Sequence, residues 1–289
     1  MENHHPIPYR PEYLDYRPIF SDKEKEVLAG LAAEIPLTEL QAMPRAFETS
    51  AIEYAFVSSQ IERNSYTLKD TVALLKFGMT VGSKPFNDAL MIKNINEAYE
   101  AICRREPSVY PTLSKPFVCG LHETLSHGLL HKSECGVLRD KPVTIAGTDY
   151  VPLTGQMLLE AELGNLLKVA QRIENPFECA VYVHMNLAYL QCFSDCNKRT
   201  ARLMQTAVMA DNNIIPILLQ TTDIVDYQFS VVDYYETGDY RAYAQLFRRA
   251  FRHTVDQLLG RTPEQKEAQA LAEAAIRHRR TRSEENTCG

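Results

Sequence analysis

The sequence predicts an all-α fold that carries one small β-hairpin. Apolar residues recur at three- and four-residue spacing, the period of a helix, over most of the chain between Ser21 and Leu259. Few segments alternate with the period of two that is typical of half-buried strands. Hydrophobic residues make up 45% of the 289 positions, which is enough to bury the core of one domain with an elaboration, or of two small domains.

The first half of the chain predicts an extended arm, several helices and the hairpin. Residues 1–20 are rich in proline and tyrosine, so we expect an arm, and Ser21 with Glu24 has the spacing of a capping box that opens a helix. In the segment Pro142–Pro152, two β-prone pairs flank Ala-Gly-Thr-Asp, which predicts a short hairpin. Four further segments have helical periodicity: Phe47–Gln60, Leu68–Phe77, Ala89–Arg104 and Phe117–Leu130.

The second half contains the strongest helix start. Asn175 is a good cap, Pro176 suits the first helical position, and Glu178 has the spacing that completes a capping box. A second helix is expected from about Lys198 to Asp211, and Asp223–Leu259 is again helical in pattern. The stripe that should bury the first of these helices consists of Ala180, Val183, Leu187 and Leu190.

Charge and composition exclude several classes of protein. The net charge is -6, whereas a nucleic-acid binder usually carries a basic balance, so no nucleic-acid partner is expected. No stretch of about 18 apolar residues predicts a membrane span, and the N-terminus has no secretory signal. Seven cysteines, an odd number without a CxxC pair, indicate reduced thiols in a cytoplasmic protein.

The segment 190–204, LQCFSDCNKRTARLM, predicts a site for an anion. A helix ends here and another begins about five residues later, and the first amides of the second helix have no partners within it. Such helix ends bind phosphate, and Lys198, Arg199 and Arg202 add positive charge. Asp195 in the loop could hold Mg²⁺ that bridges phosphate oxygens. The alternative is an ordinary helix junction, with Asp195 as a cap and the basic face in solvent.

The same segment resembles the signature of the Fic family, His-Pro-Phe-x-(Asp/Glu)-Gly-Asn-Gly-Arg-x-x-Arg. Here it begins at Gln191 and ends at Arg202. Five positions match the signature, Phe193, Asp195, Asn197, Arg199 and Arg202, and four depart from it, Gln191, Cys192, Cys196 and Lys198.

Two other segments resemble the family in the correct order. SSQIERNSYTL, residues 58–68, is similar to the family's N-terminal inhibitory helix; Ser58, Glu62 and Asn64 match, and Arg63 replaces the usual glycine. GVLRDKPVTIAGTDYVPL, residues 136–153, resembles its Gly-x-x-Arg stretch and the flap hairpin that follows. The three segments lie within residues 45–255.

The resemblance implies a helical Fic (Fido) fold that transfers AMP from ATP to Ser, Thr or Tyr hydroxyls of a protein target, which the sequence does not identify. It implies that residues 1–95 contain the arm and the inhibitory helix, that residues 96–259 form the Fic core, and that 260–289 is a polar, helical or flexible tail. A homodimer is compatible with the sequence, which does not specify the oligomeric state.

The resemblance also assigns roles. Asp195 would hold Mg²⁺, and Asn197, Lys198, Arg199 and Arg202 would surround the ATP phosphates. Glu62 would pair with Arg202 at the place of the γ-phosphate. The flap that registers the target consists of Val143, Thr144, Ile145, Ala146 and Gly147.

Gln191 stands where the family has its catalytic histidine, and an amide cannot accept the proton of the target hydroxyl. A general base contributes about 10²- to 10⁴-fold, so we expect a chain that binds ATP and Mg²⁺ but is catalytically impaired. His184 lies two turns earlier, about 10 Å away, and is predicted to be a core residue.

Three alternatives to this interpretation stay open. Another base could act, with His122, His127 and His131 as candidates. Asn-Lys-Arg also occurs in Doc-type kinases, so phosphotransfer is a minor alternative. The fold could also be a nucleotide-independent protein-interaction module. Side chains at Cys196 and Lys198, where the family has glycines, should crowd or reset the anion site.

Overall fold

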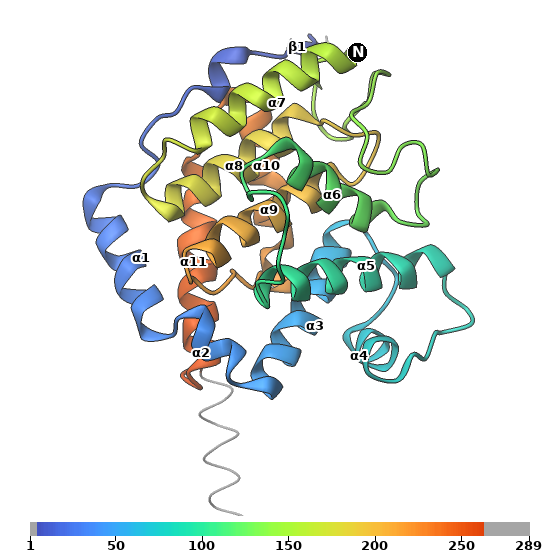
Figure 1. The fold of residues 1–289 in the computed structure, drawn as a ribbon, viewed down its shortest axis with the longest axis vertical. Coiled ribbons are helices and arrows are strands. Elements are labelled where there is room, and N and C mark those ends of the chain that lie inside the picture. Colours follow the sequence, from blue (N-terminus) through green and yellow to red (C-terminus); the bar gives the residue numbers. More distant parts are fainter. Residues whose placement is uncertain (1–4, 263–289) are drawn as a thin grey trace, which may run out of the picture.

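The computed structural model describes residues 5–262, which contain eleven α-helices and one two-stranded sheet (Figure 1). The helices are α1 (Asp22–Glu34), α2 (Leu37–Gln41), α3 (Pro44–Ile61), α4 (Leu68–Phe77), α5 (Phe86–Cys103), α6 (Lys115–Ser126), α7 (Gln156–Ala170), α8 (Pro176–Leu190), α9 (Asn197–Asp211), α10 (Ile224–Thr237) and α11 (Arg241–Leu258). Two 3₁₀ helices, η1 (Pro11–Leu14) and η2 (Thr221–Asp223), and two strands, β1 (Ile7–Pro8) and β2 (Tyr150–Val151), complete the fold.

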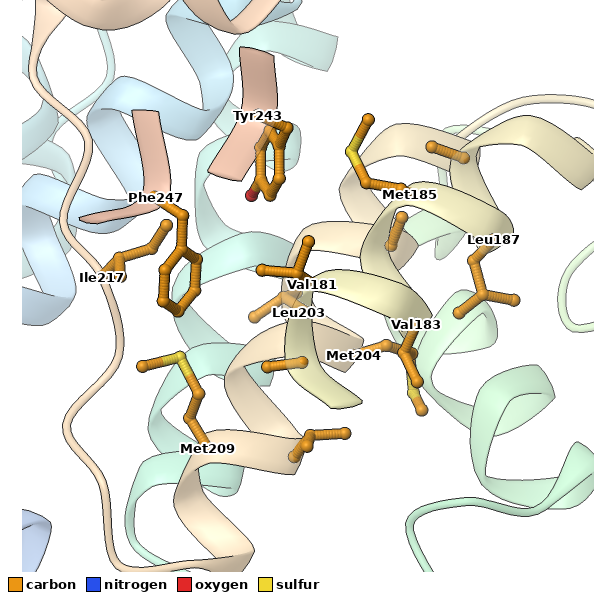
Figure 2. Close-up of a cluster of buried hydrophobic side chains, with 14 of the residues drawn as sticks. Val181, Val183, Met185, Leu187, Leu203, Met204, Met209, Ile217, Tyr243 and Phe247 are labelled. Carbon is orange, nitrogen blue, oxygen red and sulfur yellow. The ribbon is translucent and has the colours of Figure 1, made fainter. Parts of the chain in front are cut away.

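The all-α class is confirmed, and α8 lies at the centre of the core. Every residue of α8 from Phe177 to Leu190 is buried, so the helix is covered all round rather than along the predicted stripe. Figure 2 shows side chains of α8 and α9 meeting between the two helices, with Tyr243 and Phe247 of α11 on another side. This packing fixes both helices that flank the candidate site.

The predicted helix starts are largely confirmed. Ser21 and Glu24 form the capping box that opens α1. The Asn175 side chain accepts hydrogen bonds from the first amides of α8. The predicted capping box at Glu178 is wrong, because this buried carboxylate instead accepts hydrogen bonds from the arm, at 2.8 Å from the Ile19 amide and 2.9 Å from the Phe20 amide.

The N-terminal arm is extended, as predicted, except at the short 3₁₀ helix η1, and it runs along one side of the molecule to α1 (Figure 1). Tyr13 and Leu14 are buried against the core. The Tyr182 hydroxyl of α8 donates to the Leu14 carbonyl at 2.6 Å. Glu178 also accepts from the Tyr16 hydroxyl at 2.5 Å, so the arm is attached along the length of α8.

The predicted hairpin at 142–152 is not formed. The chain turns at Gly147, which has φ +85°, but β2 pairs in parallel with β1 of the arm instead of with the other side of the turn. Thr148 donates to Glu236 of α10 at 2.6 Å, and the Tyr150 hydroxyl donates to the Tyr189 carbonyl at 3.0 Å. These contacts hold the second half of the segment against the core, where the arm supplies its strand partner.

Most helix boundaries agree with the periodicity within a few residues. α6 stops at Ser126, shortly before Gly128 with φ +69°, and the last helical region divides at Gly238, also at φ +69°. The sequence prediction missed α7, although its buried leucines have helical spacing. The polar tail beyond Gly260 lies almost wholly outside the described residues. Within residues 5–262, no helix is both long and apolar enough to span a membrane.

Candidate anion-binding site at the α8–α9 loop

Residues 191–196 connect α8 to α9 in a tight loop. Both ends of the loop are left-handed, with φ +49° at Gln191 and +60° at Cys196. The Asn197 side chain closes the turn, because its Oδ1 accepts from the Phe193 amide at 2.8 Å and its Nδ2 donates to the Phe193 carbonyl at 2.7 Å. Asn197, predicted to contact phosphate, therefore shapes the loop with its side chain.

Cys196 adopts the backbone conformation for which a glycine is best suited. A left-handed residue with a side chain costs about 1–2 kcal/mol, and the thiol is buried, which raises its pKa to about 12. Lys198 does not share this conformation, and its side chain is 34% exposed. The loop therefore keeps a glycine-like path at Cys196 despite the substitution.

Arg199 is the exceptional cation of the site. Its side chain is only 4% exposed, yet Nε and Nη1 have no hydrogen-bond partner among the described residues. Its remaining contact is a long one, 3.4 Å from Nη2 to Asp195 Oδ1. A guanidinium stays charged at any physiological pH, so buried donors without partners cost free energy until an acceptor arrives.

Arg202, one turn later, has a hydrogen-bond partner at each of its three guanidinium nitrogens. Its guanidinium donates to Ser58 Oγ at 3.0 Å, to the Ser58 carbonyl at 3.1 Å and to the Tyr227 hydroxyl at 3.1 Å. Its ion pair with Glu62, predicted from the resemblance, is present at 2.9 Å. Lys198 Nζ lies 3.7 Å from the other oxygen of the same carboxylate.

The pKa of Glu62 reflects this basic environment. Burial acts to raise it, but the charges of Arg202, Lys198 and Arg199 outweigh burial, so the pKa of Glu62 lies below its ordinary value. The carboxylate is therefore ionised at neutral pH and neutralises part of the positive charge of α9.

Glu62 is placed by the end of α3. The amide of Arg63 donates to Gln60 and that of Asn64 to Ser59, the hydrogen-bond pattern of a Schellman motif. Such motifs favour glycine at the left-handed position, which Arg63 occupies with φ +62°. Arg63 is exposed and makes no ion pair with Glu62 within the described residues.

Asn64, expected beside the inhibitory residues, faces another helix. Its Nδ2 donates to the Asp88 carbonyl of α5 at 2.9 Å, and its Oδ1 accepts from the Tyr66 amide at 3.0 Å. It therefore fixes the chain after α3 and does not touch Arg202.

Gln191 is buried and caps its own helix. Its Nε2 donates to the Ala188 carbonyl at 2.7 Å and to the Tyr235 hydroxyl at 3.3 Å. Both amide hydrogens are used in this way, and the group has no basic nitrogen at neutral pH. The position of the family's histidine thus carries a fixed neutral side chain.

The histidines occupy distinct places. His184 is a core residue, as predicted, and its two nitrogens lie 3.2 Å from the hydroxyls of Tyr227 and Tyr243. His127 and His131 are exposed, and Nδ1 of His131 contacts Ser133 at 2.7 Å.

His122 lies against the loop itself. Its Nδ1 accepts from the Gly136 amide at 2.9 Å, and its Nε2 lies 3.2 Å from the Asp195 carbonyl. Burial lowers its pKa to about 4. With both nitrogens engaged, His122 offers no free proton acceptor at neutral pH.

Arg139 is a site residue for which the sequence analysis gave no role. Its Nε donates to the Gln191 carbonyl at 2.6 Å, and its amide donates to the Cys192 carbonyl at 3.0 Å. Its other nitrogens donate to the carbonyls of Lys141 and Leu153, at 2.8 and 2.6 Å. Arg139 thereby ties the end of α8 to the two residues that flank the segment Pro142–Pro152.

The predicted flap and metal ligand are both accessible. Thr144, Ala146 and Gly147 are exposed, and Val143 and Ile145 are half-buried. The Asp195 side chain is 64% exposed. Within residues 5–262, no three His, Cys, Asp or Glu side chains gather as a metal site would need, so Asp195 would require phosphate oxygens or water as further ligands.

Comparison with known proteins places this site in a family. Residues 112–209 match the Fic/DOC family. The chain is 26% identical over 223 residues to a "Protein adenylyltransferase Fic" from Nematostella vectensis, covering 76% of this chain and 51% of that protein. A "Protein adenylyltransferase fic-1" from Caenorhabditis elegans is 21% identical, with 76% and 43% covered. The chain thus spans about half the length of these curated relatives.

Two solved structures share the fold. Fic-1 (residues 134–508) from C. elegans superposes with a TM-score of 0.69 at 20% identity, covering 83% of this chain and 71% of that one. A Fic family protein from Desulfovibrio desulfuricans G20 gives a TM-score of 0.70 at 20% identity, with 84% and 77% covered. The family match and the shared fold agree: this chain contains a Fic domain, matched over residues 112–209.

Proposed function

We propose that this chain binds ATP with Mg²⁺ at the α8–α9 loop and that Gln191 greatly weakens the AMP transfer to protein hydroxyls for which its relatives are named. The observation that carries the proposal is Arg199, a buried guanidinium with two nitrogens that have no partner among the described residues. A protein bears such a cost where a ligand relieves it.

The residues around the loop fit a nucleotide phosphate. Arg199 would donate its free N–H groups to phosphate oxygens, and charge-assisted bonds of this kind are strong. The first amides of α9 face the same end of the helix, where the helix dipole favours an anion. Asp195 is the accessible carboxylate that would hold Mg²⁺, and Mg²⁺ would neutralise charge on the phosphates.

Proton transfer is the step for which no residue of the loop is suited. The amide of Gln191 cannot accept a proton, and both nitrogens of His122 are engaged. A target hydroxyl placed beside the loop would therefore stay protonated. The rate of transfer should be lower by about 10²- to 10⁴-fold than with a positioned base.

The contact between Glu62 and Arg202 supports a closed state of the site. While Glu62 holds Arg202 and contacts Lys198, neither cation is fully available to phosphate. Arg199 is then the main free cation, so the described state would accept ATP in a pose that uses Arg199 and the loop.

Calorimetric titration with Mg-ATP tests the proposal. The wild type should bind, Arg199→Ala should bind at least tenfold more weakly, and Arg241→Ala, which removes an arginine of α11 that is 88% exposed, should bind like the wild type. A parallel assay with α-labelled ATP should detect little autolabelling. If the wild type does not bind Mg-ATP at all, the chain is better explained as a nucleotide-independent interaction module.

A further inference from the structure

Carbonyl groups of the α8–α9 loop accept hydrogen bonds from α6, from the segment that follows α6 and from the first turn of α9. Arg139 donates hydrogen bonds to the carbonyls of Gln191 and Cys192, from Nε at 2.6 Å and from its amide at 3.0 Å. The carbonyl of Phe193 accepts a hydrogen bond from the Asn197 side chain at 2.7 Å. The carbonyl of Cys196 accepts from the Thr200 amide of α9 at 2.9 Å. The carbonyl of Asp195 has its partner outside α9, Nε2 of His122 in α6, at 3.2 Å.

His122 is held rigidly in the orientation that this contact requires. Its side chain is fully buried, and its ring stacks on Phe193 with centroids 3.8 Å apart and planes 5° apart. Nδ1 accepts from the Gly136 amide at 2.9 Å. Because Nδ1 is an acceptor, the proton of the neutral ring is on Nε2, which therefore donates to Asp195.

Gly136 is required for this arrangement. It has φ +72°, and a Cβ at this position would lie 3.0 Å from the Cys119 carbonyl and 3.3 Å from the Glu123 side chain. The segment from Gly136 to Arg139 thus holds the loop at two points: Arg139 binds the beginning of the loop directly, and Gly136 binds its end through His122.

The contact at the Asp195 carbonyl determines where the Asp195 carboxylate lies. In a planar trans peptide the C=O and the following N–H point in opposite directions. With the carbonyl turned toward His122, the amide of Cys196 points away from it, and this amide donates to Asp195 Oδ1 at 2.5 Å. One carboxylate oxygen is thereby fixed, and the other is left for a ligand.

We infer that His122 is a positioning residue, which orients the Asp195 carboxylate for a cation through the peptide between Asp195 and Cys196. The inference rests on the proposed function, because the cation concerned is the Mg²⁺ of bound Mg-ATP. His122 itself touches no ligand; it acts on the carboxylate through the backbone.

Two substitutions of His122 distinguish the roles of its two ring nitrogens. His122→Gln can place an amide N–H near the position of Nε2 and keep the bond to Asp195, whereas His122→Asn places its amide near Nδ1 and can keep only the bond to Gly136. Affinities for ATP with and without Mg²⁺ are measured by calorimetry for both variants and the wild type. Circular dichroism and thermal unfolding establish that each variant is folded.

We expect Mg²⁺ to strengthen ATP binding in the wild type, and this gain to fall about tenfold in His122→Asn but to stay within about threefold in His122→Gln. Hydrogen exchange of the amides at 193–197, measured without any ligand, should accelerate in the Asn variant alone. Equal behaviour of the two variants in both measurements would overturn the inference.

A wild-type measurement decides the case if neither variant folds. Nitrogen NMR of the imidazole should show Nε2 protonated and Nδ1 unprotonated at neutral pH, and the opposite tautomer would overturn the inference. Failure of the wild type to bind ATP would reject the proposed function, and loop exchange and the tautomer would still decide the role of His122.

Discussion

The starts of α8 and α9 are close in sequence, but their hydrogen-bonding groups find partners in opposite ways. At α8, the Asn175 side chain caps the first amides, and the buried carboxylate of Glu178 accepts from the arm. At α9, no side chain caps the helix, and the buried guanidinium of Arg199 keeps two nitrogens without partners among the described residues. The difference teaches that the polar groups at the start of α8 are satisfied within the fold, whereas Arg199 at the start of α9 has buried donors that the other described residues do not satisfy.

The largest effect on stability should come from the α8 side. Glu178→Ala removes the acceptor of two arm amides, one of them buried, so the free energy of unfolding should fall by about 3 kcal/mol, measured by urea denaturation. Glu26→Ala, at an exposed position of α1, should change it by less than about 0.5 kcal/mol. A loss that small at Glu178 would remove the distinction between the two helix starts.

On the α9 side, the largest effect should come from restoring a base. Gln191→His combined with Glu62→Gly should raise AMP transfer or autolabelling about 10²-fold over Glu62→Gly alone, the scale of a general base. If the double variant binds Mg-ATP but shows no AMP transfer or autolabelling, Cys196 and Lys198 should be replaced by glycine next. Efficient labelling by the wild type and equally by Gln191→Ala would instead show that another group is the base.

The two arginines of α9 offer a direct test of what an unsatisfied group costs. Arg199→Met removes a buried charge without adequate partners, so the ligand-free protein should become more stable by about 1 kcal/mol. Arg202→Met removes a guanidinium with a partner at every nitrogen and should destabilise the protein. Thermal unfolding without nucleotide measures both, and a destabilised Arg199→Met would indicate that Arg199 serves the fold.

The smallest effect should be a dependence on pH. Because the pKa of Glu62 is lowered in the folded state, its ion pairs contribute stability above the unfolded pKa of about 4.3. That contribution is lost as pH falls through the folded pKa. Glu62→Gln should therefore be less stable than the wild type by about 1 kcal/mol at pH 7, and the difference should shrink below about pH 4. A difference that stays constant with pH would mean that Glu62 contributes no charge interaction.

Local signals in the sequence predict much of the fold. Caps and helical periodicity place α1, α4, α5, α8 and α9 within a few residues, because their causes are contained in the segments themselves. The predictions of the hairpin and of the capping box at Glu178 are wrong because the partners of these residues lie far away in the sequence. The partner of β2 is β1, and that of Glu178 is the arm, and no local pattern records contacts across such distances.

The candidate site also has parts that the sequence predicts and parts that it does not. The resemblance predicts that Glu62 meets Arg202, and the two are in contact, while the inhibitory role stays a prediction. The hydrogen bonds of His122 and Arg139 to the loop arise from the packing of α6 against α9 and from the path of the segment that follows α6. The Gly-x-x-Arg spacing was the signal available for them, and it gives no geometry by itself.

The attachment of the arm to Glu178 has a consequence for how the chain folds during its synthesis. Phe20 and Glu178 are 158 residues apart, and Tyr13 and its partner Glu236 are 223 residues apart. At about 5–20 residues per second, the arm would leave the ribosome roughly 10 to 30 s before Glu178 is made. The arm therefore emerges well before the residues it docks on, and for that interval its tyrosines are open to chaperones.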